Sequence, residues 1–244
     1  MQNKRASISI GIMVIVTLVL FVFILVSLNF QASKLSDNFN AVSQLNGIYS
    51  EQQGMENTLH FRLVEVFLNS YQETLKENSL KVGKEQVNFK EIFEKKIYSK
   101  VTARATEKDS QLNDLFSGID PVVFNGETVY VTKTPYIIEK NLTFDDLNGS
   151  RILYSSSLNS SVSFAMLELP SFNYINESYS SCSGLSSKIL IEKCFVEKFS
   201  KFNMGVTIDS TKIIVSSRDK YYLTNKMQVV KFELEVVLPV ENGS

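Results

Sequence analysis

The sequence contains one histidine, no tryptophan and two cysteines among its 244 residues. His60 has no recognisable nucleophile or orienting partner nearby in the sequence, which excludes Ser-His-Asp and Cys-His arrangements. Metal clusters are excluded for the same reason. Glycine and proline number only ten and four, and no glycine-rich phosphate-binding loop or flexible linker occurs. We therefore expect no catalytic residue, no metal site and no cofactor, and we interpret His60 as a packing or surface residue.

Charge is balanced, with a formal net charge of −1 and no long block of either sign. A nucleic-acid partner is not expected, because it would select a basic face. The adjacent carboxylates Asp145 and Asp146 have asparagine and glycine nearby, which favours a plain turn over an acid pair. Glu233 and Glu235 share one face of an alternating strand, and that face is predicted to be wet.

No charged residue occurs between Arg5 and Lys34, and residues 8–28 are almost entirely apolar. A bilayer core about 30 Å thick requires roughly 20 apolar residues in a helix, which this segment supplies. A signal peptide would have a shorter apolar region of about 7–15 residues and a better cleavage context, and a buried core helix would show a polar stripe. We predict a retained transmembrane helix over residues 7–30, after a short N-terminus of residues 1–6.

Lys4 and Arg5 directly precede the apolar segment, and the positive-inside rule keeps them in the cytoplasm. The protein is therefore predicted to be a single-pass membrane protein whose C-terminal part lies outside the cytoplasm. Five Asn-x-Ser/Thr sequons agree with export, although an Asn- and Ser-rich chain also produces them by chance: Asn141, Asn148, Asn159, Asn176 and Asn242.

Both cysteines, Cys182 and Cys194, fall in the predicted exported part. In an oxidising compartment they favour one disulfide, which closes a short loop and contributes about 3 kcal/mol. Two buried thiols are the alternative.

Residues 31–118 are predicted to form a helical stalk and further helices. Apolar residues recur there in steps of three and four, as on one face of an amphipathic helix: Leu35, Phe39, Val42, Leu45, Tyr49, Met55, Leu59, Leu63, Val66 and Leu75. This face is expected to pack on the protein's own domain. Gly47 and Gly54 either bend one long helix, which we favour, or separate two helices. Further amphipathic helices are predicted at residues 87–105 and 111–116.

Residues 119–244 are predicted to form an α+β domain with a mainly antiparallel sheet. A hairpin is expected at residues 122–131, with Asn125 and Gly126 in a type I′ turn. Further strands are expected at residues 136–139, 152–155, 162–169, 206–209, 212–216 and 227–238, and one helix at residues 185–201. The last strand alternates apolar and charged residues, so one face should be buried. Two serine-rich stretches, residues 155–163 and 178–187, are expected to be exposed loops.

Lys4, Arg5 and Ala6 before a long apolar helix, an amphipathic continuation and a β-rich head resemble type IV pilin-like, class III signal-anchored envelope proteins. The resemblance covers the N-terminal segment and the overall architecture. It implies leader cleavage after Ala6 or Arg5, which leaves Ser7 or Ala6 first, and packing of the helix into a filament core. The sequence departs from the family pattern where Ile10 or Gly11 replaces a glutamate, and where Ala6 replaces a glycine.

These features favour a non-catalytic structural or surface-assembly protein, whose partners are the lipid bilayer and either copies of itself or another envelope protein. The alternative is a stalked ligand-binding or adhesion ectodomain that acts through a partner.

Overall fold

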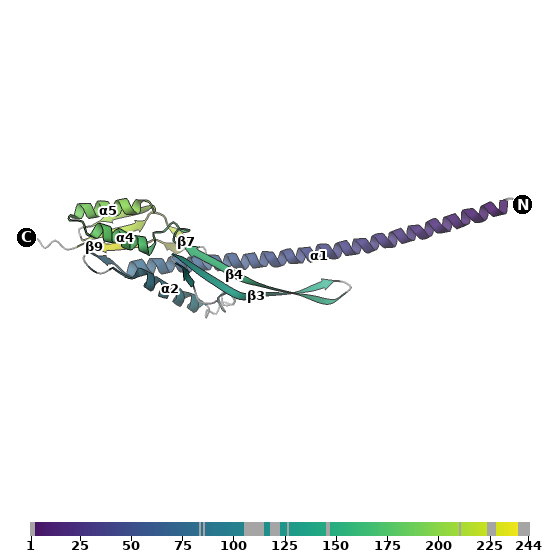
Figure 1. Cartoon of the computed structure of the whole chain (residues 1–244), viewed down its shortest axis with the longest axis horizontal. Helices are drawn as coiled ribbons and strands as arrows, with labels where there is room; N and C mark the ends of the chain where they lie inside the picture. Colours follow the sequence, from purple (N-terminus) through teal and green to yellow (C-terminus); the bar gives the residue numbers. More distant parts are fainter. Residues whose placement is uncertain are drawn as a thin grey trace, which may run out of the picture. The chain divides into compact units, whose positions relative to one another are not determined.

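A computed structural model describes residues 3–82, 84, 86–104, 115–117, 123–125, 127–144, 147–209, 211–223 and 228–238. It describes only the backbone of residues 3–12, 33–41, 104, 123, 140–144, 147–152, 222–223 and 228. The fold class is α+β, as predicted. The elements are α1 (Asn3–Glu77), β1 (Leu80–Lys81), α2 (Phe89–Arg104), β2 (Val123–Asn125), β3 (Thr128–Phe144), β4 (Leu147–Ser163), α4 (Phe172–Ser183), α5 (Lys188–Ser200), β5 (Met204–Ile208), β6 (Lys212–Ser217), β7 (Tyr221–Leu223), β8 (Gln228–Val230) and β9 (Glu233–Val237) (Figure 1).

The chain divides into two compact units, which we describe separately. The first unit comprises Met1–Gln52 and Ile137–Tyr154, and the second comprises Gln53–Tyr136 and Ser155–Ser244. Helix α1 and strands β3 and β4 each contribute residues to both units.

Helix α1 includes both glycines that left its continuity open in the sequence. Gly47 and Gly54 are helical, and a Cβ added at either would meet no atom within 4 Å. A glycine inside a helix costs about 1 kcal/mol relative to alanine, which the length and packing of such a helix offset. The favoured alternative, one helix that continues through both glycines, is therefore confirmed.

The C-terminal part of α1 forms the centre of the second unit. The predicted apolar face is buried there, at Leu59, Leu63, Val66 and Leu75. The helix ends where the Asn78 side-chain amide donates to the Thr74 carbonyl oxygen at 2.9 Å. The next residues form β1, so the helix passes directly into the edge of a sheet.

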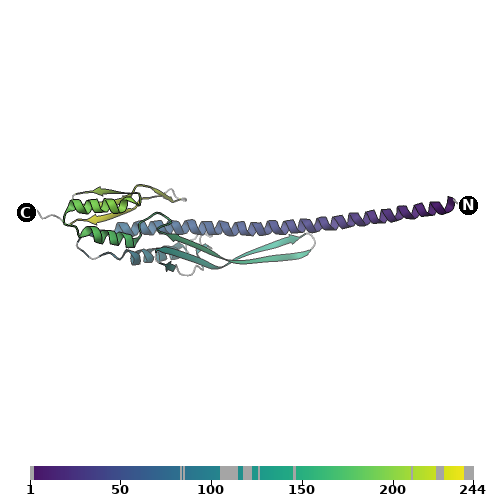
Figure 2. The same cartoon turned by 45° about the horizontal axis from the view of Figure 1, so that its top comes forward.

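Helix α2 lies alongside this part of α1 (Figure 2). The ring centroids of Phe93 and Phe67 are 5.1 Å apart, while Lys96 pairs with Glu77 and Lys100 pairs with Glu73, both at 2.6 Å. These ion pairs are partly exposed and contribute little individually, so the aromatic contact dominates. The predicted helix at residues 87–105 is confirmed within two residues at each end. Of the predicted helix at residues 111–116, Leu115 and Phe116 are helical and buried, and residues 111–114 lie outside the described residues.

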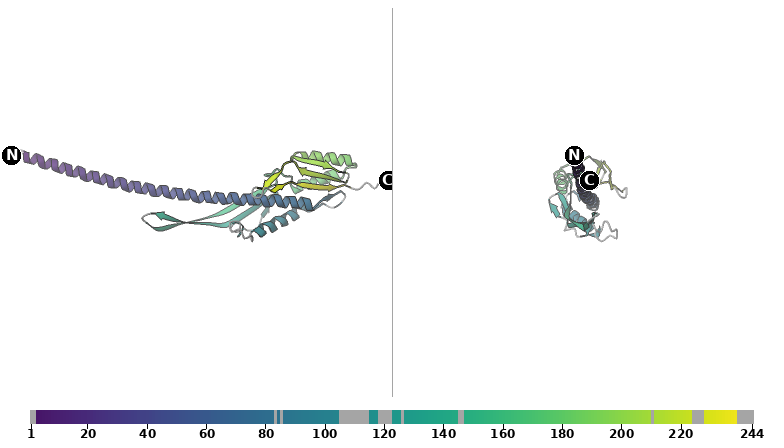
Figure 3. Two further views of the ribbon diagram at one scale, coloured as in Figure 1. Left: turned by 180° about the vertical axis from the view of Figure 1, so that it is seen from behind. Right: turned by 90° about the vertical axis from the view of Figure 1, so that its right-hand side faces the viewer.

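The second unit contains a four-stranded sheet in the order β1-β9-β6-β5, in which only the β1–β9 pair is parallel (Figure 3). The predicted burial of alternate residues in the last strand is confirmed at Phe232, Leu234 and Val236. The prediction of one strand over residues 227–238 is wrong, however, because β8 pairs with β7 and β9 pairs with β6. The chain changes partner at Phe232, whose backbone N–H and carbonyl both bond to Ser217.

Strands β2, β3 and β4 form a separate three-stranded sheet. Strands β3 and β4 have 17 residues each and are far longer than the predicted strands at residues 136–139 and 152–155. The predicted hairpin turn is shifted by one residue. Asn125 pairs with Thr128, so Gly126 and Glu127 connect the strands, and Asn125 does not have the positive φ of a type I′ turn.

Three local predictions in this half of the chain are corrected. The predicted strand at residues 162–169 ends at Ser163, because the Leu169 N–H bonds to the Phe164 carbonyl at 2.9 Å across a tight turn. The serine-rich residues 155–163 belong to β4, and most of residues 178–187 belong to α4 or its C-terminal turn. The predicted turn at Asp145 and Asp146 lies outside the described residues.

Helices α4 and α5 pack against each other, and α5 also contacts β5 and β6. Each begins at a serine whose side chain accepts a backbone N–H bond: Ser171 from Tyr174 and Ser187 from Leu190. The helix predicted at residues 185–201 corresponds to α5, which starts at Lys188 because Ser187 caps it. Helix α4 was not predicted.

The core of the second unit is a cluster of aromatic rings from helices, strands and turns. Phe164, in the turn after β4, lies between rings of three helices, with centroid distances of 5.0 Å to Phe67 and 5.2 Å to Phe172. The remaining members are Tyr71, Phe89, Phe93, Phe124, Tyr221 and Phe232. Such pairs add about 0.5–1.5 kcal/mol each beyond the burial of their surface, so these contacts join residues distant in the sequence.

Tyr71 is the one member of the cluster whose polar atom is fully buried, among the residues for which side chains are described. Its hydroxyl donates to the Pro170 carbonyl oxygen at 2.8 Å, which ties α1 to the residue just before the cap of α4. Burial raises the pKa of Tyr71 well above its usual value, and the nearby Tyr221 raises it further. The neutral phenol is therefore the form that the fold requires.

We predict that Tyr71→Phe lowers the free energy of unfolding by about 1–3 kcal/mol, because the Pro170 carbonyl loses its buried donor. Since the pKa of Tyr71 is higher in the folded than in the unfolded chain, its contribution is complete below pH ~10 and is lost as pH rises above it. Denaturation of the full chain in detergent micelles at pH 8 to 11 should give a shallower alkaline decline for Tyr71→Phe. Tyr98→Phe, at an exposed position, is the matched control, and an equal decline in both variants would contradict the assignment.

Candidate functional site

Helix α1 carries the apolar segment, and the described residues of this segment are fully exposed. Met13–Ala32 is long and apolar enough to cross a membrane, with a mean hydropathy of 2.8 and no residue buried within the protein. Phe23, for example, is 75 % exposed. The one threonine in the segment, Thr17, satisfies its hydroxyl within the helix by donating to the Met13 carbonyl at 2.7 Å. The segment therefore has the length, composition and exposure of a membrane span.

The residues predicted to flank a leader cleavage site, Arg5, Ala6 and Ser7, lie at the beginning of α1. Their backbone is helical, and their side chains lie outside the described residues. Cleavage there stays a prediction.

Beyond the apolar segment, the first unit gives α1 a covered face and an exposed face. Ile48 is completely buried. The ring of Tyr154 from β4 meets that of Tyr49 edge-on at 5.8 Å, and its hydroxyl donates to Gln52 Oε1 at 2.7 Å. We call these contacts of Tyr154 with Tyr49 and Gln52 the tyrosine clamp. It fixes β4 to α1 within this unit.

The exposed face is apolar and contains three residues of the predicted amphipathic stripe. Val42 is 55 % exposed, Leu45 39 % and Tyr49 57 %. Their steps of three and four residues place them on one side of the helix. The prediction that the stripe packs on the protein's own domain is thus confirmed for Leu59 and the buried residues after it, and it is wrong for Val42 and Leu45. Tyr49 is exposed and also packs edge-on against Tyr154. Leu35 and Phe39 have side chains outside the described residues.

The predicted disulfide is present between Cys182 of α4 and Cys194 of α5, with Cα atoms 5.6 Å apart. Cys182 is completely buried, so the bond lies between the two helices and fixes their pairing. A disulfide of this kind persists in oxidising compartments, which agrees with a domain outside the cytoplasm.

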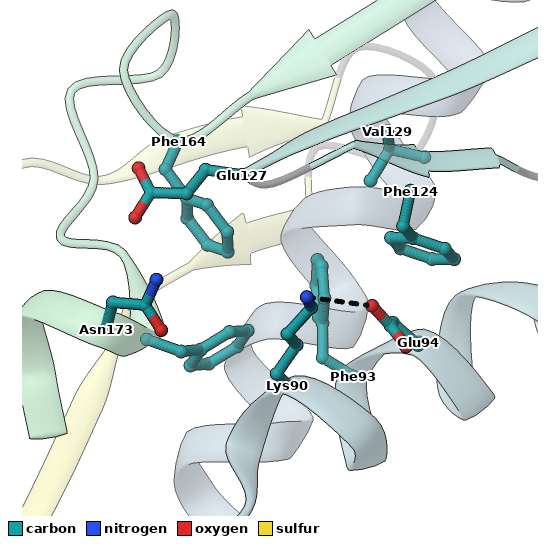
Figure 4. Close-up of a pocket in the computed structure, with 9 residues that line it drawn as sticks. Lys90, Phe93, Glu94, Phe124, Glu127, Val129, Phe164 and Asn173 are labelled. Carbon is teal, nitrogen blue, oxygen red and sulfur yellow. Dashed lines mark ion pairs between the residues drawn. The ribbon is translucent and has the colours of Figure 1, made fainter.

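One pocket formed by described residues lies over the aromatic core of the second unit (Figure 4). Its floor consists of phenylalanine rings, and its rim carries Lys90, Glu94, Glu127 and Asn173. Lys90 and Glu94 form an ion pair at 3.9 Å across the rim. About 20 Å³ is open to the centres of water-sized molecules, which is room for about one water. This space is too small for an organic substrate.

A second hollow is shallow, open to solvent and polar. It is lined by side chains of α4 and by Gln86, whose amide donates to Ser180.

His60 lies on α1 and contacts a single polar partner among the contacts described. Its Nδ1 is 3.1 Å from the Ser160 hydroxyl of β4. This contact joins α1 to the three-stranded sheet, as expected of a packing residue. Among the described residues, no group of three histidine, cysteine or acidic side chains could hold a metal ion.

The predicted sequons fall in different environments. Asn159 is exposed on β4. Asn176 lies within α4 with its amide oxygen buried, and Ser178 of the same sequon is also buried. Asn141 and Asn148 lie in β3 and β4 with side chains outside the described residues, and Asn242 is itself outside them. Glycosylation stays a prediction at all five positions, with Asn159 more accessible than Asn176.

The sequence analysis missed the tyrosine clamp and the buried Ile48. Tyr154 lies in the strand predicted at residues 152–155, but no local signal marks its contact with α1. Ile48 follows Leu45 by three residues and fits a helical apolar pattern. It was overlooked because the neighbouring Gly47 suggested a bend or break in the helix.

Comparison of the chain with models of protein families, with curated proteins and with solved structures finds no match.

Proposed function

We propose that this protein is a non-catalytic, membrane-anchored structural component whose folded domain lies outside the cytoplasm and assembles with copies of itself or with another envelope protein. Three features support export: the basic residues Lys4 and Arg5 before the apolar segment, the sequons, and the Cys182–Cys194 disulfide.

The observation that carries the proposal is that one helix is both the apolar segment and the centre of the domain. Leu59 and Leu63 are completely buried, and the apolar segment Met13–Ala32 belongs to the same helix. A domain that only had to be tethered would need no more than a flexible linker to its anchor. A helix that is shared by the anchor and the core instead couples any load on the domain directly to the membrane, which suits a structural role.

The surface for assembly is the exposed face of α1 at Val42, Leu45 and Tyr49. Apolar residues at this spacing form the contact seam when two helices pack side by side. The membrane confines copies of the chain to one plane and aligns their helices, which raises their effective concentration. A second copy is therefore the natural partner for this face.

A narrower form of the proposal is a pilin-like protein that is processed before assembly. It would lose its first five or six residues and begin at Ala6 or Ser7. Supporting features are the Lys4-Arg5-Ala6 sequence before the apolar segment and the extension of the same helix into an α+β domain.

For the pilin-like form, we predict that the N-terminal peptide of protein from native membranes has the mass of a chain starting at Ser7 or Ala6. Mass spectrometry of that peptide shows whether the chain is cleaved at this site. An intact N-terminus would contradict processing and leave the anchored structural component.

For assembly, we predict that Val42→Cys forms covalent dimers when a membrane-impermeant bifunctional thiol reagent is added to intact cells that express the full chain. Ser43→Cys is the matched control, because the next residue is turned by about 100° around the helix and Ser43 is also exposed. It should react with an impermeant monofunctional maleimide and should not cross-link.

The labelling and cross-linking results distinguish three failures of the proposal. Failure of Ser43→Cys to react from outside would contradict the predicted orientation. Equal cross-linking of both variants would contradict a specific helix face. Labelling without cross-linking of either variant would contradict self-assembly and favour the ectodomain that acts through another protein.

A further inference from the structure

The first unit contains a feature that the proposed function does not use. Strands β3 and β4 continue past the tyrosine clamp as a two-stranded ribbon, from Ile137 to Phe144 and from Leu147 to Tyr154. A two-stranded ribbon is marginally stable in water without further support. A ribbon of this length therefore requires a structural explanation.

The direction of this ribbon is set by the clamp and by the strand order. Within the first unit, β3 and β4 run alongside α1 toward its N-terminal, apolar end in Figures 1 and 2 and in the left view of Figure 3. In the second unit, Ser160 of β4 contacts His60 of α1, so later residues of β4 meet later residues of the helix. Both observations direct the strand ends at Phe144 and Leu147 toward the apolar end of α1.

Its reach follows from the rise per residue of a helix and of a strand. Gln52 follows Ala32, the end of the apolar segment, by twenty residues, or about 30 Å of helix. Leu147 precedes Tyr154 by seven residues, or about 23 Å of strand. Because Tyr154 is bonded to Gln52, the backbone at Leu147 lies within about 10 Å of the level of Ala32, measured along the helix. The headgroup layer occupies about 5–8 Å on each side of the hydrocarbon core.

We propose that the ends of β3 and β4 at Phe144 and Leu147 lie at the lipid headgroup layer of the membrane that α1 crosses, and that they form a second, off-axis contact with the bilayer. The inference depends on the membrane-spanning part of the proposed function and not on self-assembly.

The composition of this end fits contact with headgroups better than insertion or electrostatic capture. Residues 140–151 contain two basic residues, Lys140 and Arg151, and two acidic residues, Asp145 and Asp146. Their charges cancel, so anionic lipids provide no net attraction. The contact should therefore be as close on zwitterionic lipid as on anionic lipid.

A second contact changes what the anchor can do. A single transmembrane helix can tilt and rotate about its axis, because its orientation depends on flanking anchors and neighbours. A contact to one side of the helix restricts both motions. It thereby fixes which way the exposed face at Val42, Leu45 and Tyr49 points in the plane of the membrane.

The test compares the depth of the ribbon with the depths of two positions on α1. The full chain is reconstituted in phosphatidylcholine vesicles that contain a headgroup-linked nitroxide quencher, with one fluorophore at Ser43→Cys, Ser50→Cys or Ser150→Cys. Positions 43 and 50 lie about 16 and 27 Å beyond Ala32 along the helix, and position 150 lies at about 17 Å by the ribbon path. The native cysteines are paired in the disulfide and do not react.

We expect Ser150→Cys to be quenched as strongly as Ser43→Cys and more strongly than Ser50→Cys, with and without anionic lipid. Quenching of Ser150→Cys at or below the level of Ser50→Cys would overturn the inference. If Ser43→Cys is itself not quenched more than Ser50→Cys, the span is not seated in the bilayer, and the failure belongs to the proposed function.

A second variant tests the clamp. Tyr154→Ala removes both the ring contact with Tyr49 and the bond to Gln52, so quenching at Ser150→Cys should fall while that at Ser43→Cys stays the same. Unchanged quenching at both positions would contradict positioning of the ribbon by the clamp.

Discussion

The structure depends on one helix whose two parts are apolar in different ways. At Met13–Ala32, α1 exposes its apolar side chains and has the length and composition of a membrane span. From Leu59 to Leu75 the same helix buries one face in a protein core. The core of the second unit is arranged around this part of the helix: α2 lies along it, β1 follows it directly, and the turn at Phe164 brings rings of α1, α2 and α4 together.

The aromatic cluster explains why so many separate segments form one core. Tyr71 contacts Phe164, Phe172 and Phe232 at centroid distances of 5.1 to 5.4 Å. Those three rings follow it by more than ninety residues, so the core cannot form before distant parts of the chain meet. The disulfide joins α4 to α5 through Cys182, which is itself part of the buried core of this unit.

The sequence predicts well those elements whose period is regular. The buried stripe from Leu59 onward and the alternation from Val230 to Leu238 were predicted, because each repeats a helical or strand period over several turns or pairs. The apolar segment was predicted from its length and its lack of charged residues. The helix near Lys188 was also predicted. The disulfide followed from the presence of only two cysteines. The boundaries of elements were predicted less accurately. The single strand predicted at residues 227–238 is two strands, β8 and β9, because each pairs with a different partner strand.

Helix α4 shows why the rest was missed. Phe172, Ile175, Tyr179 and Cys182 follow steps of three and four residues, and Ser171 provides a cap, but the serines among them suggested a loop. The loop prediction thus followed the serine content of the segment and overlooked the helical spacing of its apolar residues. The tyrosine clamp has no such signal, because it depends on two segments about a hundred residues apart. The exposure of Val42, Leu45 and Tyr49 likewise could not be inferred, since the length of the domain along the helix is a tertiary property.

The central claim is that the anchor and the core are one uninterrupted helix. Hydrogen exchange of the full chain in lipid nanodiscs, followed by mass spectrometry, tests this most directly. The account predicts continuous protection of the backbone amides from residue 42 through Gly47 and Gly54 to Leu75. Rapid exchange confined to residues 46–54, with protection on both sides, would show a flexible hinge and contradict the claim.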